Sequence, residues 1–146
     1  MGGLLYQASK DGFGVSSFHG RCHGKGSSLT IVETKSGNVF GGYSSTSWYN
    51  SGGYRASSGA FLFRLRPSMK RYDLINSKAT NAIYTHSSYG PTFGNHDIYM
   101  NNCQAVATCY AHRQAYNIPS SSRYELNDGA MYFRIKDYAV VQAKAL

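Results

Sequence analysis

The sequence predicts a single, mainly β domain, on three observations. Several stretches of roughly four to seven residues alternate apolar and polar side chains, which is the two-residue period of a half-buried strand. Clusters of Gly, Asn and Ser separate these stretches, as is typical of turns. Helical periodicity is confined to two short segments, and the length of 146 residues suits one domain. We therefore expect one domain over residues 1–146, built mainly from antiparallel sheet.

Six segments combine this alternation with β-branched or aromatic residues, the composition that strands favour. The first two form the clearest hairpin, because Gly37 in the turn between them can adopt a positive φ. Residues 60–65 are apolar on both faces until Arg64, which predicts a central strand covered on two sides. The last segment is expected to bend or divide near Asp137. The six expected strands are residues 28–33, 38–43, 60–66, 82–86, 97–100 and 132–142.

Helix signals are sparse. Asp11 is suited to cap a short helix over residues 14–22, which places Phe18 and Cys22 four residues apart on one helical face. A second helical turn is expected around residues 76–81.

Two segments without periodicity, residues 44–58 and 101–128, are interpreted as loops rich in Tyr, Ser and Asn. On a β scaffold, such loops commonly carry recognition. The single Trp of the chain, Trp48, is expected to pack under its loop. Other residues of these loops either form a second aromatic and polar surface or complete the core: Tyr49, Tyr54, Tyr110, His112, Arg113 and Tyr116.

The composition favours a binding protein. Charged residues make up only 15% of the chain, below the roughly 25% of a typical domain, while 13 Tyr accompany many Ser and Asn residues. Antibody loops use the same mixture of rigid aromatic and small polar residues. The net charge of +8 favours anionic partners, but no run of five basic residues is present, so we do not expect nucleic-acid binding. No apolar stretch approaches the ~20 residues of a membrane span.

The three cysteines, Cys22, Cys103 and Cys109, leave at least one thiol unpaired within the chain. Buried or reduced thiols are the favoured interpretation. A local bridge between Cys103 and Cys109, or a link between two chains, is the alternative in an oxidising compartment.

Catalytic and metal-binding patterns are weak, so we expect a protein that is not an enzyme and requires no cofactor. The seven acidic residues are scattered, and no Gly-x-Ser-x-Gly elbow occurs. His19, Cys22 and His23 share one helical turn, but no second ligand pair stands at a recognisable spacing.

The richest constellation spans residues 89–102, where amide, imidazole and carboxylate groups lie beside aromatic rings. A pyranose needs donors and acceptors for its hydroxyls and an aromatic ring for its apolar face, which these residue types provide. Oxygens of Asn and Asp also suit a Ca²⁺ ion. The alternative is that residues 94–97 are simply a turn entering a strand. The candidate ligand-binding residues are Tyr89, Asn95, His96, Asp97, Tyr99, Asn101 and Asn102.

Ordered blocks over nearly the whole chain resemble the TLDc domain family. They include SKDGF (residues 9–13), GNVFGGY (residues 37–43) and SSYGPTFGNHDIY (residues 87–99). The resemblance implies a sandwich of two antiparallel β-sheets flanked by short helices, without an established catalytic site. Better-known intracellular members of that family protect against oxidative stress and bind the vacuolar proton-pumping ATPase. Residues 94–102 here lack the glycine run and the acidic strand of those members, and the chain is basic.

Two functions follow as hypotheses. The favoured one is an extracellular lectin that recognises glycans or glycoproteins, with a galactoside as the guessed sugar and an oligomer, for instance a homodimer, raising the affinity. The alternative is a cytoplasmic adaptor that binds the vacuolar ATPase and acts in oxidative-stress resistance. Direct antioxidant chemistry by the cysteines is a weaker third hypothesis, since no basic cluster lowers their pKa values.

Overall fold

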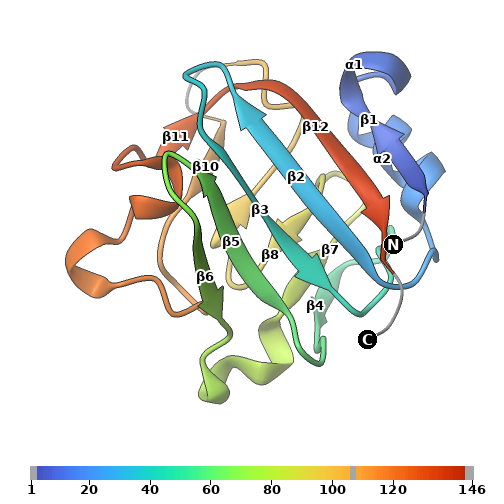
Figure 1. Cartoon of the computed structure of the whole chain (residues 1–146). Coiled ribbons are helices and arrows are strands. Elements are labelled where there is room, and N and C mark those ends of the chain that lie inside the picture. Colours follow the sequence, from blue (N-terminus) through green and yellow to red (C-terminus); the bar gives the residue numbers. More distant parts are fainter. Residues whose placement is uncertain (1–2, 106–107, 144–146) are drawn as a thin grey trace.

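Two antiparallel sheets form a sandwich in the computed structural model, which describes residues 3–105 and 108–143 (Figure 1). Within these residues each sheet has six strands, which confirms the predicted fold class. From edge to edge, the first sheet contains β1 (Leu4–Gln7), β12 (Ile135–Gln142), β2 (Ser28–Thr34), β3 (Val39–Ser44), β5 (Phe61–Arg66) and β6 (Lys70–Asp73). The second contains β11 (Tyr132–Phe133), β10 (Cys109–Ala111), β9 (Ile98–Tyr99), β8 (Thr92–Phe93), β7 (Ile83–Thr85) and β4 (Gly53–Arg55).

All six expected strands are present, some of them shortened. The hairpin β2–β3 is confirmed, and Gly37 in its turn has a φ of 94°, in the left-handed region that favours glycine. The segment 132–142 is divided into β11 and β12, and the pairing of β12 with β2 shifts its register between Ile135 and Asp137. The predicted break near Asp137 is therefore a bulge.

The strands that the sequence did not reveal are short. β1, β4, β6, β8 and β10 have two to four residues each, too few to display an alternating pattern. Two of them, β4 and β10, lie in segments that we interpreted as loops. This error matters, because both strands place a Tyr on the outer face of the second sheet.

The helices are α1 (Ala8–Asp11) and α2 (Val15–Cys22), with 3-10 turns η1 (Asn76–Asn81), η2 (Ser120–Ser122) and η3 (Glu125–Asn127). The expected helix face is confirmed, since Phe18 and Cys22 are both buried. The expected helical turn at 76–81 is confirmed as η1. The expected capping by Asp11 is wrong. Its carboxylate instead accepts a hydrogen bond from the Gln7 N–H at 2.9 Å, and no side chain caps α2.

The core fills the space between the two sheets. Alternate residues of β2 and β3, such as Val32 and Phe40, face Phe93 and Ile98 of the second sheet, and Trp48 is buried under its loop as expected. Gly42 is required at this interface because a Cβ there would stand 2.6 Å from the Phe93 ring. The Phe93 ring thus occupies the space that a side chain at position 42 would need.

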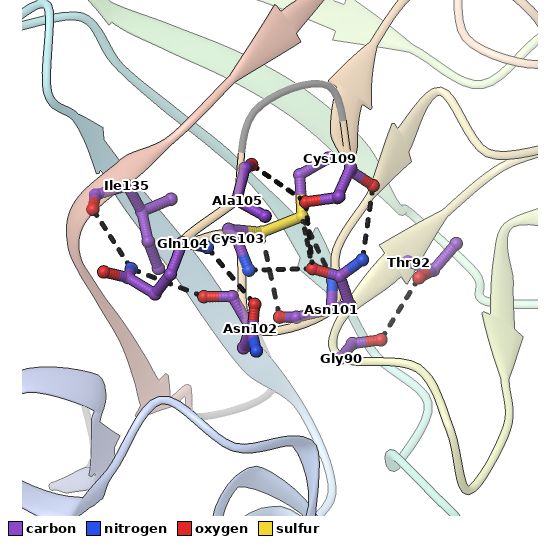
Figure 2. Close-up of a disulfide and its surroundings, with 10 residues drawn as sticks. Gly90, Thr92, Asn101, Asn102, Cys103, Gln104, Ala105, Cys109 and Ile135 are labelled. Atoms are coloured by element: carbon purple, nitrogen blue, oxygen red, sulfur yellow. Dashed lines mark hydrogen bonds between the residues drawn. A yellow bond between two sulfur atoms is a disulfide. The ribbon is translucent and has the colours of Figure 1, made fainter.

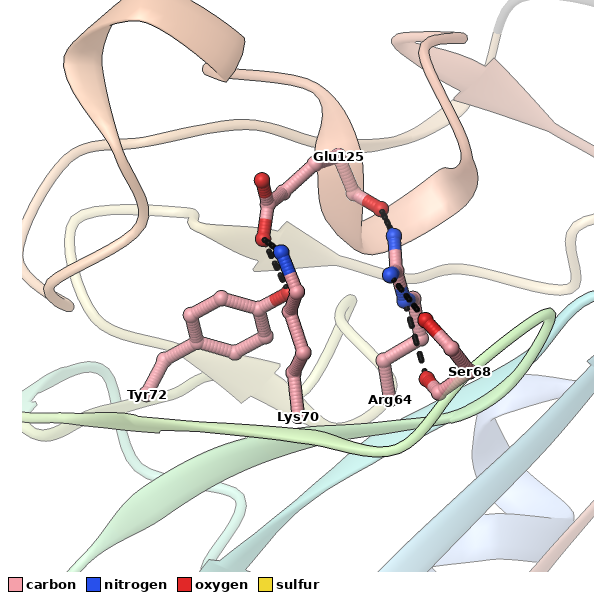
Figure 3. Close-up of polar contacts among 5 residues, drawn as sticks. All are labelled: Arg64, Ser68, Lys70, Tyr72 and Glu125. Carbon is pink, nitrogen blue, oxygen red and sulfur yellow. Dashed lines mark hydrogen bonds and ion pairs between the residues drawn. The ribbon is translucent and has the colours of Figure 1, made fainter.

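The prediction that β5 is covered on both sides is wrong. Phe61 and Phe63 lie half-exposed on the outer face, while Leu62 and the charged Arg64 point inward. Arg64 is only 7% exposed, and Figure 3 shows how its guanidinium is satisfied. It donates to the Glu125 carbonyl oxygen at 2.8 Å, to the Ser68 carbonyl oxygen at 3.1 Å and to Ser68 Oγ at 2.6 Å. One side chain therefore joins β5, the β5–β6 turn and η3.

We expect Arg64→Ala to lower the free energy of unfolding by about 2–3 kcal/mol, because the carbonyl groups of Ser68 and Glu125 lose a charged donor and the buried side chain leaves a cavity. Urea denaturation measures this loss. Arg66→Ala is the matched control, since its side chain is 61% exposed and pairs with Glu33 only at 3.7 Å; a loss below about 1 kcal/mol is expected there. Equal losses in the two variants would contradict the assigned role of Arg64.

Candidate functional site

Tyrosines form a cross-strand row on the outer face of the second sheet. Strand pairing places Tyr132 opposite Tyr110, Tyr110 opposite Tyr99, and Tyr54 opposite Tyr84. Directly opposite residues project from the same face of a sheet. The alternate residues of these strands point the other way and are buried in the core: Ile83, Phe93, Ile98, Cys109 and Phe133.

The rings of this row are in contact from one edge of the sheet to the other. Centroid distances are 4.8 Å for Tyr54–Tyr84, 5.2 Å for Tyr99–Tyr110 and 6.1 Å for Tyr110–Tyr132. Over β8, the Tyr89 ring closes the gap, 5.3 Å from Tyr84 and 4.9 Å from Tyr99. The imidazoles that contact these rings are His86, His96 and His112. We define the tyrosine face as Tyr54, Tyr84, Tyr89, Tyr99, Tyr110 and Tyr132 with these three imidazoles.

The tyrosine face is accessible along its length. Tyr54 at one end is 43% exposed and Tyr132 at the other is 49% exposed, while the rings between them are half-buried. Interlocked rings with free edges make a rigid surface that loses little conformational entropy when a ligand binds.

At His96, His112, Tyr89 and Tyr110 of this face, the pKa is shifted toward the neutral form. Burial lowers the pKa of His96, and burial together with nearby Arg123 lowers the pKa of His112. Burial and the neighbouring phenols raise the pKa of Tyr89 and Tyr110. At neutral pH these four groups offer uncharged donors and acceptors.

The lowered pKa values of His96 and His112 make stability depend on pH. Below the unfolded value of about 6.5, the unfolded chain binds more protons than the folded one, so the free energy of unfolding falls as the pH drops from 6.5 toward the folded pKa values. Comparing the native chain with His96→Gln/His112→Gln isolates this contribution. We expect the stability of the native chain, relative to that variant, to be lower at pH 5.5 than at pH 7.5. A difference that does not change with pH would contradict the lowered pKa values.

Three of the seven sequence-predicted site residues, Tyr89, His96 and Tyr99, come together in the tyrosine face. Asn95 lies in the turn before β9 and accepts a hydrogen bond from Asn81 at 2.7 Å. Asp97 has no exposed surface with which to contact a ligand. Residues 94–97 form a turn entering β9, which is the alternative that the sequence left open.

The Asp97 carboxylate binds the backbone of the loop that follows β10 and is not free to bind a ligand. Its carboxylate accepts hydrogen bonds from the N–H groups of Gln114, Ala115 and Tyr116 at 2.8–2.9 Å. Gly94 makes room for it, because a Cβ there would stand 2.2 Å from Asp97 Oδ1. Burial raises the pKa of Asp97 to about 6, and the backbone N–H groups limit this rise. We therefore remove Asp97 from the candidate site.

Asn101 and Asn102 directly precede Cys103, which forms a disulfide with Cys109 (Figure 2). Asn101 Oδ1 accepts a hydrogen bond from the Cys103 N–H at 2.8 Å, and Asn102 Oδ1 accepts one from the Gln104 N–H at 3.2 Å. Both side chains thus bind the backbone two residues further along the chain.

The disulfide joins Cys103 and Cys109, with Cα atoms 5.4 Å apart. The favoured interpretation of reduced thiols is wrong for these two residues, and the local bridge is the correct alternative. Cys22 is free and buried, and burial raises the pKa of its thiol to about 12. A thiol of this kind is a poor nucleophile at neutral pH, which argues against antioxidant chemistry at Cys22.

Three loop residues for which the sequence left open a second surface or a core position, Tyr54, Tyr110 and His112, belong to the tyrosine face itself. Tyr116 is a core residue. The guanidinium of Arg55 lies 4.8 Å over the Tyr49 ring, and Arg113 donates to the Ile118 carbonyl oxygen. Only strand pairing reveals the common surface, because its members are widely spaced in sequence.

His19 connects α2 to this surface. Its Nε2 donates to the carbonyl oxygens of His86 and Tyr89, each at 2.8 Å, and so fixes the turn that carries Tyr89. Among residues 3–105 and 108–143, no group of three or more His, Cys, Asp or Glu side chains is arranged to hold a metal ion. In the same ranges, no helix has the length and apolar character needed to cross a membrane.

The family comparison matches residues 3–140 of this chain to the TLDc domain. The match spans nearly the whole chain and includes both sheets and the tyrosine face. It indicates a binding or adaptor module rather than any one ligand. By this match and by its two-sheet sandwich, the chain belongs to the TLDc domain family.

Proposed function

We propose that this chain is a lectin-type module that binds a neutral glycan on the tyrosine face. The observation that carries the proposal is the unbroken row of accessible, uncharged rings from Tyr54 to Tyr132. A pyranose stacks its C–H face on such rings, while phenol and imidazole groups bind its hydroxyls.

The length of the row favours an oligosaccharide over a single sugar. Six strands at a spacing of ~4.8 Å make it about 24 Å long. Affinity would then come from several modest stacking contacts along the face. A galactoside remains the proposed terminal sugar, because the apolar face of galactose is well suited to an aromatic ring.

No catalytic step and no resident cofactor belong to this proposal. Binding relies on rings and neutral hydrogen-bonding groups, so we propose that Ca²⁺ is optional. The Cys103–Cys109 disulfide supports an oxidising, extracellular compartment, since such bonds persist there.

Family membership favours a second candidate, an adaptor that docks on another protein such as the vacuolar ATPase and acts in oxidative-stress resistance. Tyrosines are also enriched at protein interfaces. The tyrosine face as defined contains no Lys, Arg, Asp or Glu side chain to steer such docking, which is why we place the glycan first.

A glycan array probed with the full chain, with and without Ca²⁺, tests the proposal. We expect saturable binding to galactose-terminated oligosaccharides that Ca²⁺ does not change. No saturable binding, together with no sugar-induced shift in Tm, would overturn it. Capture of vacuolar ATPase subunits from a cell extract, combined with a negative array, would establish the adaptor instead.

A further inference from the structure

The first sheet carries an apolar outer face on the opposite side of the sandwich. Strand pairing aligns Val141, Leu29, Tyr43 and Phe61 in one cross-strand row. A second row aligns Ala139, Ile31, Gly41 and Phe63. We call the side chains of these two rows the apolar face. Each of them except Gly41, which is buried, lies at intermediate exposure.

No described element covers the apolar face. Figure 1 shows β12, β2, β3 and β5 side by side in front of the molecule, while the helices α1 and α2 lie beside the β1 edge. At that edge Leu4, which pairs with Val141, is 54% exposed and extends the apolar surface.

The rings of the apolar face contact one another and their neighbours. Tyr43 and Phe61 stack at 5.4 Å, and the Arg71 guanidinium lies 4.0 Å over the Phe61 ring. Phe63 covers Gly41, where a Cβ would approach its ring to 2.9 Å. These contacts fix the rings in place, so a partner would dock on a preformed surface.

Its size fits a small protein interface. Across the strands, the face spans five strands at ~4.8 Å spacing. Along the strands, it spans three side-chain rows at ~6.8 Å spacing, of which two are apolar and the third is the charged rim. Together these dimensions give roughly 480 Å² per copy. Two copies would bury about 1,000 Å² in total, the lower limit for a specific interface. The two apolar rows account for roughly 330 Å² of this area, the size of a patch that is often functional.

The rim indicates that the partner is a second copy of this chain. Both charge signs occur at each end of the face, as the pairs Arg66–Glu33 at 3.7 Å and Arg71–Asp73 at 2.8 Å. In a two-fold interface the same patch meets itself, which requires an apolar centre and a rim that can pair with its own image. A highly charged partner would instead require a rim of one sign.

We infer that the outer face of the first sheet is a homodimer interface. In a sandwich, the outer faces of the two sheets point in opposite directions. Back-to-back pairing therefore presents two tyrosine faces on opposite sides of the dimer. Insofar as the proposed glycan function holds, the dimer is a bivalent cross-linker whose avidity exceeds the affinity of one site.

Light scattering coupled to size-exclusion chromatography tests the interface with the full chain. We expect the native chain to elute with about 32 kDa, twice its mass of 16.1 kDa. Ile31→Lys, at the centre of the apolar face, should give a folded monomer. Tyr132→Lys, on the opposite face, is the matched control and should remain a dimer.

A monomeric native chain at micromolar concentrations would overturn the inference, as would a folded Ile31→Lys dimer. If Ile31→Lys does not fold, Tyr43→Thr replaces it in the test, because Thr keeps the β propensity of the strand. A folded Tyr43→Thr dimer would likewise overturn the inference. Failure of the proposed function is separable. A dimer that binds no glycan contradicts only that function, whereas a monomer that binds glycan contradicts only the interface.

Discussion

Asp97→Ala is expected to lower the free energy of unfolding by about 3–5 kcal/mol, because three N–H groups, two of them in buried residues, lose their acceptor. These donors belong to Gln114, Ala115 and Tyr116, in the loop that follows β10. Substitution also leaves a cavity beneath the Gly94 turn. Chemical denaturation measures the loss.

Two further variants sharpen this test. Asp97→Asn keeps one acceptor oxygen, so its loss should be smaller than that of Asp97→Ala. Asp73→Ala is the matched control, because the Asp73 side chain is 69% exposed and its ion pair with Arg71 should contribute at most about 1 kcal/mol. If Asp97→Ala proved as stable as Asp73→Ala, Asp97 would not be the structural anchor described above, and a role in binding would have to be reconsidered.

The same carboxylate has a defined pH dependence. Because burial raises its pKa in the folded protein to about 6, the folded chain binds more protons than the unfolded chain between pH ~4 and ~6. This contribution to stability is therefore largest at low pH and is lost as the pH rises through 6. It opposes the contribution of His96 and His112, which is why the histidine test compares variants rather than absolute stabilities.

The second large effect concerns binding. Tyr99→Ala/Tyr110→Ala is expected to weaken glycan affinity about 30- to 100-fold, because each stacking ring contributes about 1–1.5 kcal/mol. These two rings lie at the centre of the tyrosine face, 5.2 Å apart. Calorimetry with a soluble oligosaccharide gives the affinity per chain.

Tyr43→Ala is the control for this pair, since Tyr43 is a half-buried ring on the outer face of the other sheet. Its affinity for a monovalent sugar should stay within about twofold of the native value. Tyr99→Phe/Tyr110→Phe keeps both rings and should lose less than the alanine pair. An alanine pair that binds like the native chain, with its fold intact, would exclude the centre of the tyrosine face as the site.

The sequence predicted the architecture better than the site. Strands such as β2 and β3 are long enough for alternation to show, and the turn at Gly37 has recognisable chemistry. By contrast, β10 has three residues, so Tyr110 was assigned to a loop although it stands at the centre of a sheet face. Its position depends on pairing with β9 and β11, which local patterns do not encode.

The error at Asp97 has a different physical origin. A carboxylate beside aromatic residues suits a ligand site and also suits a buried anchor for backbone N–H groups, and the sequence is the same in both cases. The deciding partners, Gln114 to Tyr116, are distant along the chain and become neighbours only through tertiary structure. Likewise, the sequence around Arg64 predicts that the apolar strand becomes exposed there. The side chain is buried instead, because Ser68 and Glu125 accept hydrogen bonds from its guanidinium.

The most direct test of the central claim is NMR chemical-shift mapping of backbone amides during titration with the best oligosaccharide from the array. We predict shifts concentrated on strands β4, β7, β9, β10 and β11 and on the two turns that carry Tyr89 and His96. Shifts confined to Asn101, Asn102 and the adjacent Cys103–Cys109 disulfide, or to the outer face of the first sheet, would contradict the assignment of the tyrosine face as the glycan site.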